Sequence, residues 1–265
     1  MKLQRWLLAA LSGAALALVP TAVPGAPTVT GQAAALAADR SGQPGGGRGG
    51  GLLEPTATRP PGGGTSDQTA NGLCRPGTPP NAPPTTSFLS SNPLLGPAVL
   101  PTASPVGPLL AGYQRFGALS EAQFSQQYMN STQTAYVFPP ASGFVIAPDG
   151  RPITQAQTLL AGYRLDRFGF PGGAFLSPLG TPFSSRALPP QSLNTPENAP
   201  LANYHVYCVL QPFTVDSGPI APWFAQPGQG TQFHLNPAYL PQAGGSLTVT
   251  WLLQNGYLVE ENLLQ

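Results

Sequence analysis

The chain has 265 residues, of which 34 are proline and 32 are glycine, whereas charged residues make up only 8%. The formal net charge is +1 and lysine occurs only at Lys2, so there is no cluster of Lys and Arg to release counterions from nucleic acid or to hold an anionic membrane. The composition therefore predicts a loop-rich globular protein and argues against a nucleic-acid-binding one.

Residues 1–37 have the pattern of a secretory signal peptide. Lys2 and Arg5 precede an apolar run from Trp6 to Val19, and a small-x-small cleavage site follows before Ala38. The alternative is an uncleaved membrane anchor, but the run is shorter than the roughly 20 apolar residues that a bilayer requires. We expect a protein that is secreted or at the cell surface, with no membrane segment after cleavage.

Residues 38–70 consist mainly of Gly, Pro, Ser, Thr and Ala, with hardly a large apolar side chain. Such a segment cannot bury enough surface to offset its ordering entropy, so it is predicted to be a disordered tether. The ordered part is expected to start at residue 71, with an N-terminal arm and thumb over residues 71–160 and a catalytic domain over residues 161–265.

Cys74 and Cys208 are the two cysteines of the chain. In an oxidising compartment such a pair is expected to form a disulfide bond. The alternative is two unrelated thiols, with Cys208 buried in the core. Two Cys and two His at no recognisable spacing predict no metal site.

The best helix candidate runs from Ser120 to Met129, with Ser120 as its N-cap. Further along, Tyr136–Phe138 and Phe144–Ile146 flank a turn and predict a short β-hairpin.

After Gly169 the chain is dominated by short β-prone runs separated by Gly and Pro. Asn255-Gly256, between two such runs, predicts a two-residue hairpin turn. The spacing predicts a β-rich α+β fold with an antiparallel sheet and few helices. The predicted strands are Ala174–Leu176, Tyr204–Leu210, Phe213–Val215, Thr231–Leu235 and Leu247–Leu253.

Three blocks combine one polar side chain with aromatic residues, glycines and prolines. They are Leu165–Phe183 with Arg167, Arg186–Pro190 with Arg186, and Ala221–Phe233 with Gln232. Glycine lets a backbone approach a ligand closely, and proline lowers the entropy lost when a loop orders. The blocks therefore predict a binding cleft.

The same blocks carry a family resemblance. The motifs are LDRFG from Leu165, GAFLSPLGTPF from Gly173, RALPP from Arg186, YHVY from Tyr204 and PGQGTQ from Pro227. In this order they resemble the TNT (tuberculosis necrotizing toxin) domain, a family of secreted NAD(+) glycohydrolases that includes bacterial toxins and fungal surface NADases. The resemblance is densest over about 70 central residues.

The resemblance implies hydrolysis of NAD+ or NADP+, as substrate rather than cofactor, to nicotinamide and ADP-ribose or its phosphate. It implies Arg167 and Gln232 as catalytic residues and carries the arginine of the RALPP block to Arg186. It also implies a β-rich palm with a small N-terminal thumb, here containing the predicted helix.

The residue types agree with this chemistry. An arginine fork suits a diphosphate, so Arg167 and Arg186 are predicted to clamp it. Gln232 is predicted to position the reacting ribose. Phe168 and Phe183 are candidate contacts to a base, and His205 is a candidate substrate-binding residue whose alternative is a buried histidine of the sheet.

Other functions use the same residues. An ADP-ribosyltransferase or cyclase would pass the same oxocarbenium to another nucleophile, and a Pro/Gly-rich surface protein without catalysis would explain the composition alone. The sequence leaves open the preference between NAD+ and NADP+, calcium binding and the oligomeric state. An immunity protein is compatible with the resemblance.

Overall fold

The structure is a computed structural model that describes residues 72–198 and 202–262. The predicted signal peptide at residues 1–37 and the predicted tether at residues 38–70 lie outside the described residues. Every described residue belongs to one unit, residues 62–265.

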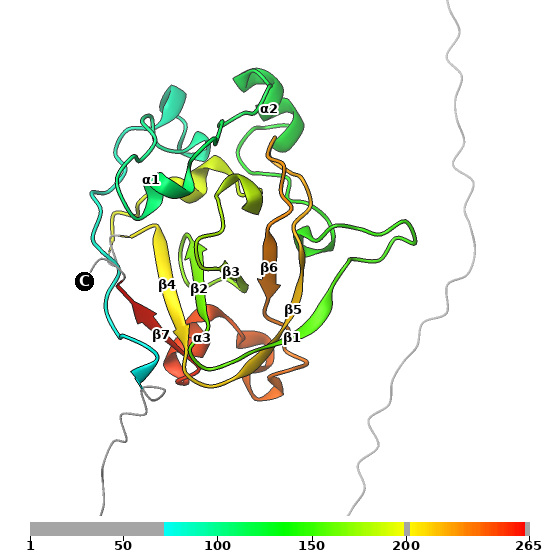
Figure 1. The fold of residues 1–265 in the computed structure, drawn as a ribbon. Coiled ribbons are helices and arrows are strands. Elements are labelled where there is room, and N and C mark those ends of the chain that lie inside the picture. Colours follow the sequence, from blue (N-terminus) through cyan, green and yellow to red (C-terminus); the bar gives the residue numbers. More distant parts are fainter. Residues whose placement is uncertain (1–71, 199–201, 263–265) are drawn as a thin grey trace, which may run out of the picture. The chain divides into compact units, whose positions relative to one another are not determined.

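A seven-stranded antiparallel sheet organises the described part of the chain (Figure 1), in the order β1-β5-β6-β3-β2-β4-β7. With only three α-helices in this part, the predicted β-rich α+β fold is confirmed. The strands are β1 (Gln155–Leu159), β2 (Arg164–Phe168), β3 (Phe175–Pro178), β4 (Tyr204–Val209), β5 (Phe213–Pro219), β6 (Thr231–His234) and β7 (Leu258–Glu261). The helices are α1 (Val106–Leu109), α2 (Glu121–Tyr128) and α3 (Val249–Gln254), and the 3-10 turns are η2 (Leu89–Ser91), η3 (Pro93–Leu95), η4 (Ala141–Gly143), η5 (Ser184–Arg186), η6 (Pro190–Leu193) and η7 (Pro241–Ser246).

Strand β4 is the most deeply buried strand, with all six residues buried between β2 and β7. Its ladder with β2 pairs Arg167 with His205 and Phe168 with Tyr204. Because side chains alternate across a strand, Arg164, Asp166 and Phe168 face one side of the sheet and Arg167 faces the other. This alternation decides which polar groups of β2 can meet.

Helix α2 begins where the sequence predicts, because the Ser120 hydroxyl accepts from the Gln123 N–H and the Gln123 side chain accepts from the Ser120 N–H. This reciprocal capping satisfies two backbone donors of the first turn. The buried face of the helix packs Phe124 and Tyr128 near Phe224. A second cluster of aromatic side chains therefore forms away from the main core.

Two predicted hairpins are wrong. Residues 249–254 form helix α3, whose N-cap Thr248 accepts from the Trp251 N–H and whose buried Val249 and Leu252 share one face. Gly256, with φ of 71°, ends this helix rather than turning a hairpin.

The segments around residues 136–146 pair elsewhere rather than with each other. Tyr136 bridges Met129, Phe144 bridges Ile220, and η4 fills the turn between them. Each segment therefore forms its backbone bridge with a neighbouring loop or with the end of a strand, and the two segments do not pair with each other.

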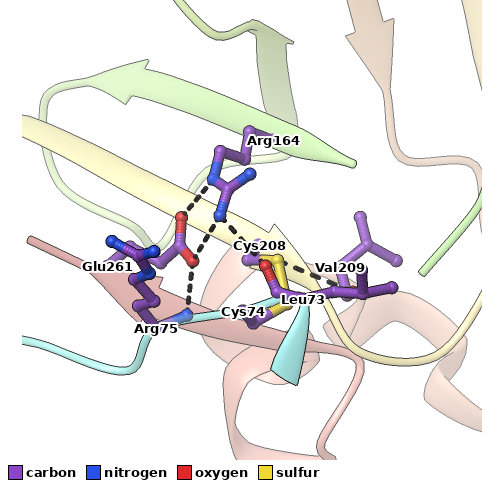
Figure 2. The surroundings of a disulfide bond; sticks show 7 residues. All are labelled: Leu73, Cys74, Arg75, Arg164, Cys208, Val209 and Glu261. Atoms are coloured by element: carbon purple, nitrogen blue, oxygen red, sulfur yellow. Dashed lines mark hydrogen bonds and ion pairs between the residues drawn. A yellow bond between two sulfur atoms is a disulfide. The ribbon is translucent and has the colours of Figure 1, made fainter. Parts of the chain in front are cut away.

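The expected disulfide bond between Cys74 and Cys208 is present, so the N-terminal arm is covalently joined to β4 (Figure 2). The sequence separation of the two cysteines is 134 residues. Pro76 also bridges Glu261 of β7, so the start of the arm lies along this edge of the sheet.

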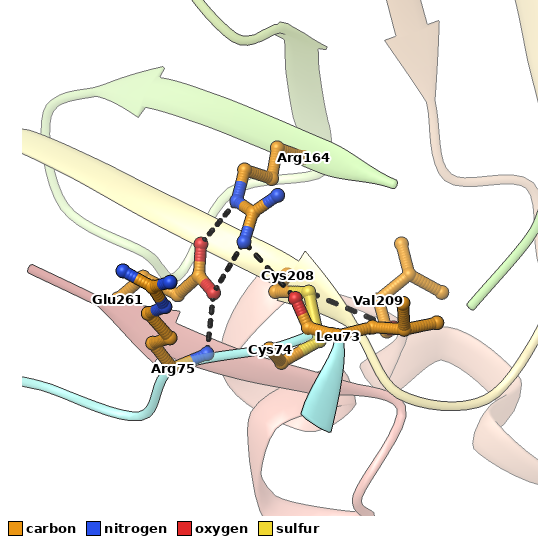
Figure 3. A network of polar contacts seen from close by, with 7 residues as sticks. All are labelled: Leu73, Cys74, Arg75, Arg164, Cys208, Val209 and Glu261. Carbon is orange, nitrogen blue, oxygen red and sulfur yellow. Dashed lines mark hydrogen bonds and ion pairs between the residues drawn. A yellow bond between two sulfur atoms is a disulfide. The ribbon is translucent and has the colours of Figure 1, made fainter. Parts of the chain in front are cut away.

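Beside the disulfide lies a network of polar contacts around Glu261 (Figure 3). The fully buried Glu261 carboxylate accepts from the Arg164 Nε at 2.7 Å and from the Arg75 N–H at 2.6 Å, while Arg164 also donates to the Leu73 carbonyl. A buried carboxylate is stable only when paired and hydrogen-bonded, as here. These hydrogen bonds join the N-terminal arm to β2 and β7 of the sheet.

Within the described ranges, no helix combines the length and the apolar character needed to cross a membrane. The boundary expected between residues 160 and 161 stays a prediction. Strand β1, from the residues assigned to the arm and thumb, pairs with β5 in the same sheet.

Candidate active site

A cavity of about 330 Å³ opens where β2, β3 and β6 end beside η5. Arg167, Arg186 and Gln232, the three polar side chains singled out from the sequence blocks, all line it. A void of about 40 Å³ adjoins it and is also lined by Asp166. The fold therefore brings together residues that are up to 65 positions apart in the chain.

Arg167 braces the loop that follows β2. Its Nε donates to the Phe170 carbonyl at 2.9 Å and an Nη donates to the Phe175 carbonyl at 2.7 Å. A Cβ added at Gly173 would collide with the guanidinium, so the glycine makes room for it. Burial lowers the pKa of Arg167, an effect that Tyr207 opposes. Arg167 thus donates two hydrogen bonds to the loop, and its side chain also lines the cavity.

Arg186 is buried and forms an ion pair with Asp166 at 2.5 Å. Its Nε donates to the Thr181 carbonyl at 2.9 Å, and its guanidinium lies 5.2 Å from the centre of the Phe168 ring. A contact of this kind between a guanidinium and an aromatic face is attractive. The arginine is therefore held in one position at the wall of the cavity.

Asp166 is the site residue that sequence reasoning missed. Its second carboxylate oxygen accepts from the Tyr204 hydroxyl at 2.6 Å and from the Gly180 N–H at 2.8 Å. Burial raises the pKa of Asp166, and the charge of Arg186 and these hydrogen bonds oppose the increase. Asp166 and Arg167 are neighbours on β2, so their side chains point to opposite faces of the strand. The alternation of side chains along β2 was therefore the sequence signal that could have separated Asp166 from Arg167.

Gln232 projects from β6 and donates to the Ser142 carbonyl at 2.8 Å through Nε2. Within the described ranges its side chain makes no other hydrogen bond, so Oε1 is available to a ligand. Arginine and glutamine therefore present donors and an acceptor to the same small space.

Aromatic rings form the apolar walls. Phe168, a candidate ligand contact, lines the cavity, and Phe175, Phe138 and Phe224 also line it. Phe175 is 38% exposed and stacks on His234 with ring centres 4.7 Å apart. Such walls suit a planar heteroaromatic ring.

Phe183 is a correction, because its ring is fully buried and does not reach the cavity. It packs edge-on against Phe168 and Tyr113, with both centroid distances at 4.9 Å. Phe183 therefore supports the Phe168 ring from behind.

His205, the other predicted substrate-binding residue, lies outside the cavity of Gln232. The ring is 1% exposed, its Nδ1 lies 2.6 Å from a carboxylate oxygen of Glu260, and it lines a different cavity of about 610 Å³. It pairs with Arg167 in the ladder, yet the guanidinium turns toward the loop after β2. The structure does not bring His205 to Gln232.

A further cavity, of about 540 Å³, lies under the proline-rich arm and is lined by prolines, alanines and hydroxyl side chains without a charged residue among its described walls. It lacks the convergent polar groups that mark a reactive site. The only described cluster with metal-ligand atoms is Cys74, Cys208 and Glu261, where the two sulfurs are bonded to each other.

Comparison with known proteins agrees with the motifs. Residues 158–260 match the family model described as tuberculosis necrotizing toxin, which confirms the resemblance. A curated relative, the conidial surface nicotinamide adenine dinucleotide glycohydrolase nadA of Aspergillus fumigatus, is 46% identical over 149 residues, or 56% of this chain. The match spans 64% of that relative's length.

Among solved structures, tuberculosis necrotizing toxin complexed with its immunity factor matches 70% of this chain and 96% of its own, with a TM-score of 0.44 and 20% identity.

Proposed function

We propose that the chain is an exported NAD+ glycohydrolase that cleaves the bond between nicotinamide and ribose. The single observation that carries the proposal is the convergence of Arg167, Arg186 and Gln232 on one aromatic-walled cavity. The match to residues 158–260 and the 46% identical relative support the same activity. The predicted signal peptide and the surface location named for that relative support secretion or display at the cell surface.

The reaction breaks the bond from C1′ of the ribose to the ring nitrogen of nicotinamide. The bonding electron pair leaves with nicotinamide, which becomes neutral, and C1′ becomes part of an oxocarbenium-like centre that a water oxygen attacks. The water then releases one proton to solvent. Because the leaving group is already cationic in the substrate, a strong general acid is not needed, and binding the transition state more tightly than the substrate does most of the catalysis.

Each residue of the cavity has a role in this scheme. The charges of Arg167 and Arg186 attract the diphosphate and fix the substrate against the ends of β2 and η5. Gln232, whose Oε1 is available, accepts from a ribose hydroxyl and orients the sugar for attack by water. Phe168 and Phe175 hold the nicotinamide ring and keep bulk water from its faces.

The test is nicotinamide release from NAD+ by the purified full chain and by Gln232→Leu. The leucine keeps the size of the side chain but removes the amide, so we expect kcat to fall by about 100-fold or more, as when one positioned polar group is lost. Gln126→Leu is the matched control, because Gln126 is exposed on α2 and lines no described cavity. Analysis of the product distinguishes hydrolysis, which gives ADP-ribose, from transfer or cyclisation.

Release of nicotinamide at the same rate by the parent and by folded Gln232→Leu would remove the glutamine from the mechanism. A folded parent without any turnover would contradict the glycohydrolase activity itself and favour a surface protein without catalysis.

A further inference from the structure

The cavity that contains His205 adjoins the candidate active site. It measures about 610 Å³, and Gln191 and Ser192 of η6 line both cavities. No Asp, Glu, Lys or Arg lines it in the described part of the chain, and His205 itself is paired with Glu260. The second cavity is therefore larger than the first, nearly uncharged and joined to it along one short turn.

The first cavity is small for a whole dinucleotide. Its volume of about 330 Å³ is near the lower end of ligand pockets, which span roughly 300 to 1,000 Å³. A dinucleotide has two nucleosides joined by a diphosphate. If the nicotinamide nucleoside lies beside Gln232, as the proposed function requires, the other nucleoside has to extend beyond this cavity.

Phe170 is placed to receive a base. It is the most exposed aromatic side chain among the described residues, at 73%, and it lines only the second cavity. None of the ring contacts of the described chain involves it. Its ring is therefore accessible to a ligand that enters the second cavity.

The ring of Phe170 also lies close to the backbone of its own loop. A Cβ at Gly172 would collide with it, so the ring lies directly against the glycine backbone with its other face open. The Phe170 carbonyl accepts from the Arg167 Nε, which fixes the backbone beneath the ring. An accessible aromatic face of this kind can act as a stacking platform for a planar base.

The polar groups around the ring suit adenine rather than a phosphate. The side-chain amide of Gln191, on the boundary between the cavities, makes no hydrogen bond within the described ranges. Amide side chains match the donor and acceptor edge of adenine. A phosphate would instead require cations, which this cavity lacks.

We propose that the second cavity binds the adenosine half of the dinucleotide, with adenine stacked on Phe170 and the Gln191 amide at its edge. The inference rests on the proposed function and deepens it, because it fixes the direction of the substrate. Nicotinamide lies beside Gln232, the diphosphate passes η6 near the two arginines, and adenosine lies beside Phe170.

The test measures AMP binding to the purified full chain by calorimetry, which needs no turnover. Phe170→Ala is expected to raise the Kd for AMP by roughly 10-fold, the scale of one lost base–aromatic stack. Phe170→Tyr keeps an aromatic ring, so its Kd for AMP is expected to stay close to that of the parent. Leu160→Ala is the matched control, because Leu160 is 65% exposed but lines no described cavity. Phe138→Ala removes an exposed ring from the first cavity and should leave the Kd for AMP unchanged.

Steady-state kinetics provide the second readout. Phe170→Ala should raise the KM for NAD+ by about the same factor as the Kd for AMP, with kcat and the inhibition constant of nicotinamide within twofold of the parent. A raised KM with an unchanged kcat and an unchanged inhibition constant of nicotinamide would show that the first cavity is intact.

The proposal is overturned if Phe170→Ala leaves both the Kd for AMP and the KM for NAD+ unchanged. It is also overturned if Phe138→Ala weakens AMP binding more than Phe170→Ala does, because adenine would then occupy the first cavity. A parent that binds AMP through Phe170 but releases no nicotinamide would contradict the glycohydrolase activity while keeping the adenosine site.

Discussion

The pair of Asp166 and Arg186 sits where β2 meets η5, with both side chains buried. Asp166→Asn would leave the guanidinium buried without a counter-charge. We expect the free energy of unfolding to fall by about 3–5 kcal/mol, as when one partner of a buried ion pair is removed. Urea denaturation measures the change.

The double variant Asp166→Asn with Arg186→Met is the control for this pair. Because methionine removes the stranded charge, the double variant should be no less stable than Asp166→Asn alone, even though it changes two residues. A loss below about 1 kcal/mol for Asp166→Asn would mean that water reaches the pair and screens it.

At the scale of single residues, the family motifs and the Gly/Pro-rich blocks pointed to Arg167, Arg186, Gln232 and Phe168. These side chains line one cavity, and their roles stay predictions. The sequence was not sufficient for Phe183, which belongs to one of the same blocks but packs inward behind Phe168. Which aromatic ring faces the cavity depends on how a loop packs against distant segments, and a local pattern does not contain that information.

At the scale of elements, β6 carries a histidine, His234, whose pKa is shifted by its surroundings. His234 is half-buried, pairs with Asp216 of β5 in the ladder and stacks on Phe175. Burial lowers the pKa of His234 below the ordinary value of 6.5, an effect that Asp216 opposes. Protonation therefore costs more in the folded state than in the unfolded state.

The sign of the pH dependence follows from this difference. Between pH 6.5 and the lower pKa of the folded state, the unfolded chain binds more protons, so stability is retained above pH 6.5 and falls as pH decreases through this window. We expect His234→Phe to lose less unfolding free energy than the parent between pH 7.5 and 5, as measured by urea denaturation at each pH. Parallel pH profiles for the two proteins would contradict a depressed pKa.

The elements also show where sequence patterns become ambiguous. Helix α2 was predictable because its capping residues Ser120 and Gln123 act locally. Helix α3 was not, because Asn255-Gly256 fits both a hairpin turn and a helix end, and only tertiary packing of Val249 and Leu252 decides between them. Strand β1 was missed because it is largely exposed and lacks an alternating apolar pattern.

At the scale of the whole molecule, the bond between Cys74 and Cys208 joins two residues that are 134 positions apart in the sequence. The double variant Cys74→Ala with Cys208→Ala should lower the free energy of unfolding by about 2–5 kcal/mol, because the unfolded chain regains the entropy of an open loop. Urea denaturation of the parent with and without a reductant gives an independent measurement. Equal urea midpoints for the reduced and the oxidised parent would contradict this contribution.

The same bond determines how a mechanical load enters the molecule. A pull at residue 72 reaches Cys74 and passes through the two sulfurs to Cys208, in a strand that has neighbours on both sides and six buried residues. Strand β4 is hydrogen-bonded to both β2 and β7, so displacing it breaks two ladders, whereas displacing an edge strand breaks one. Tension applied at residue 72 thus reaches the most deeply buried strand of the sheet.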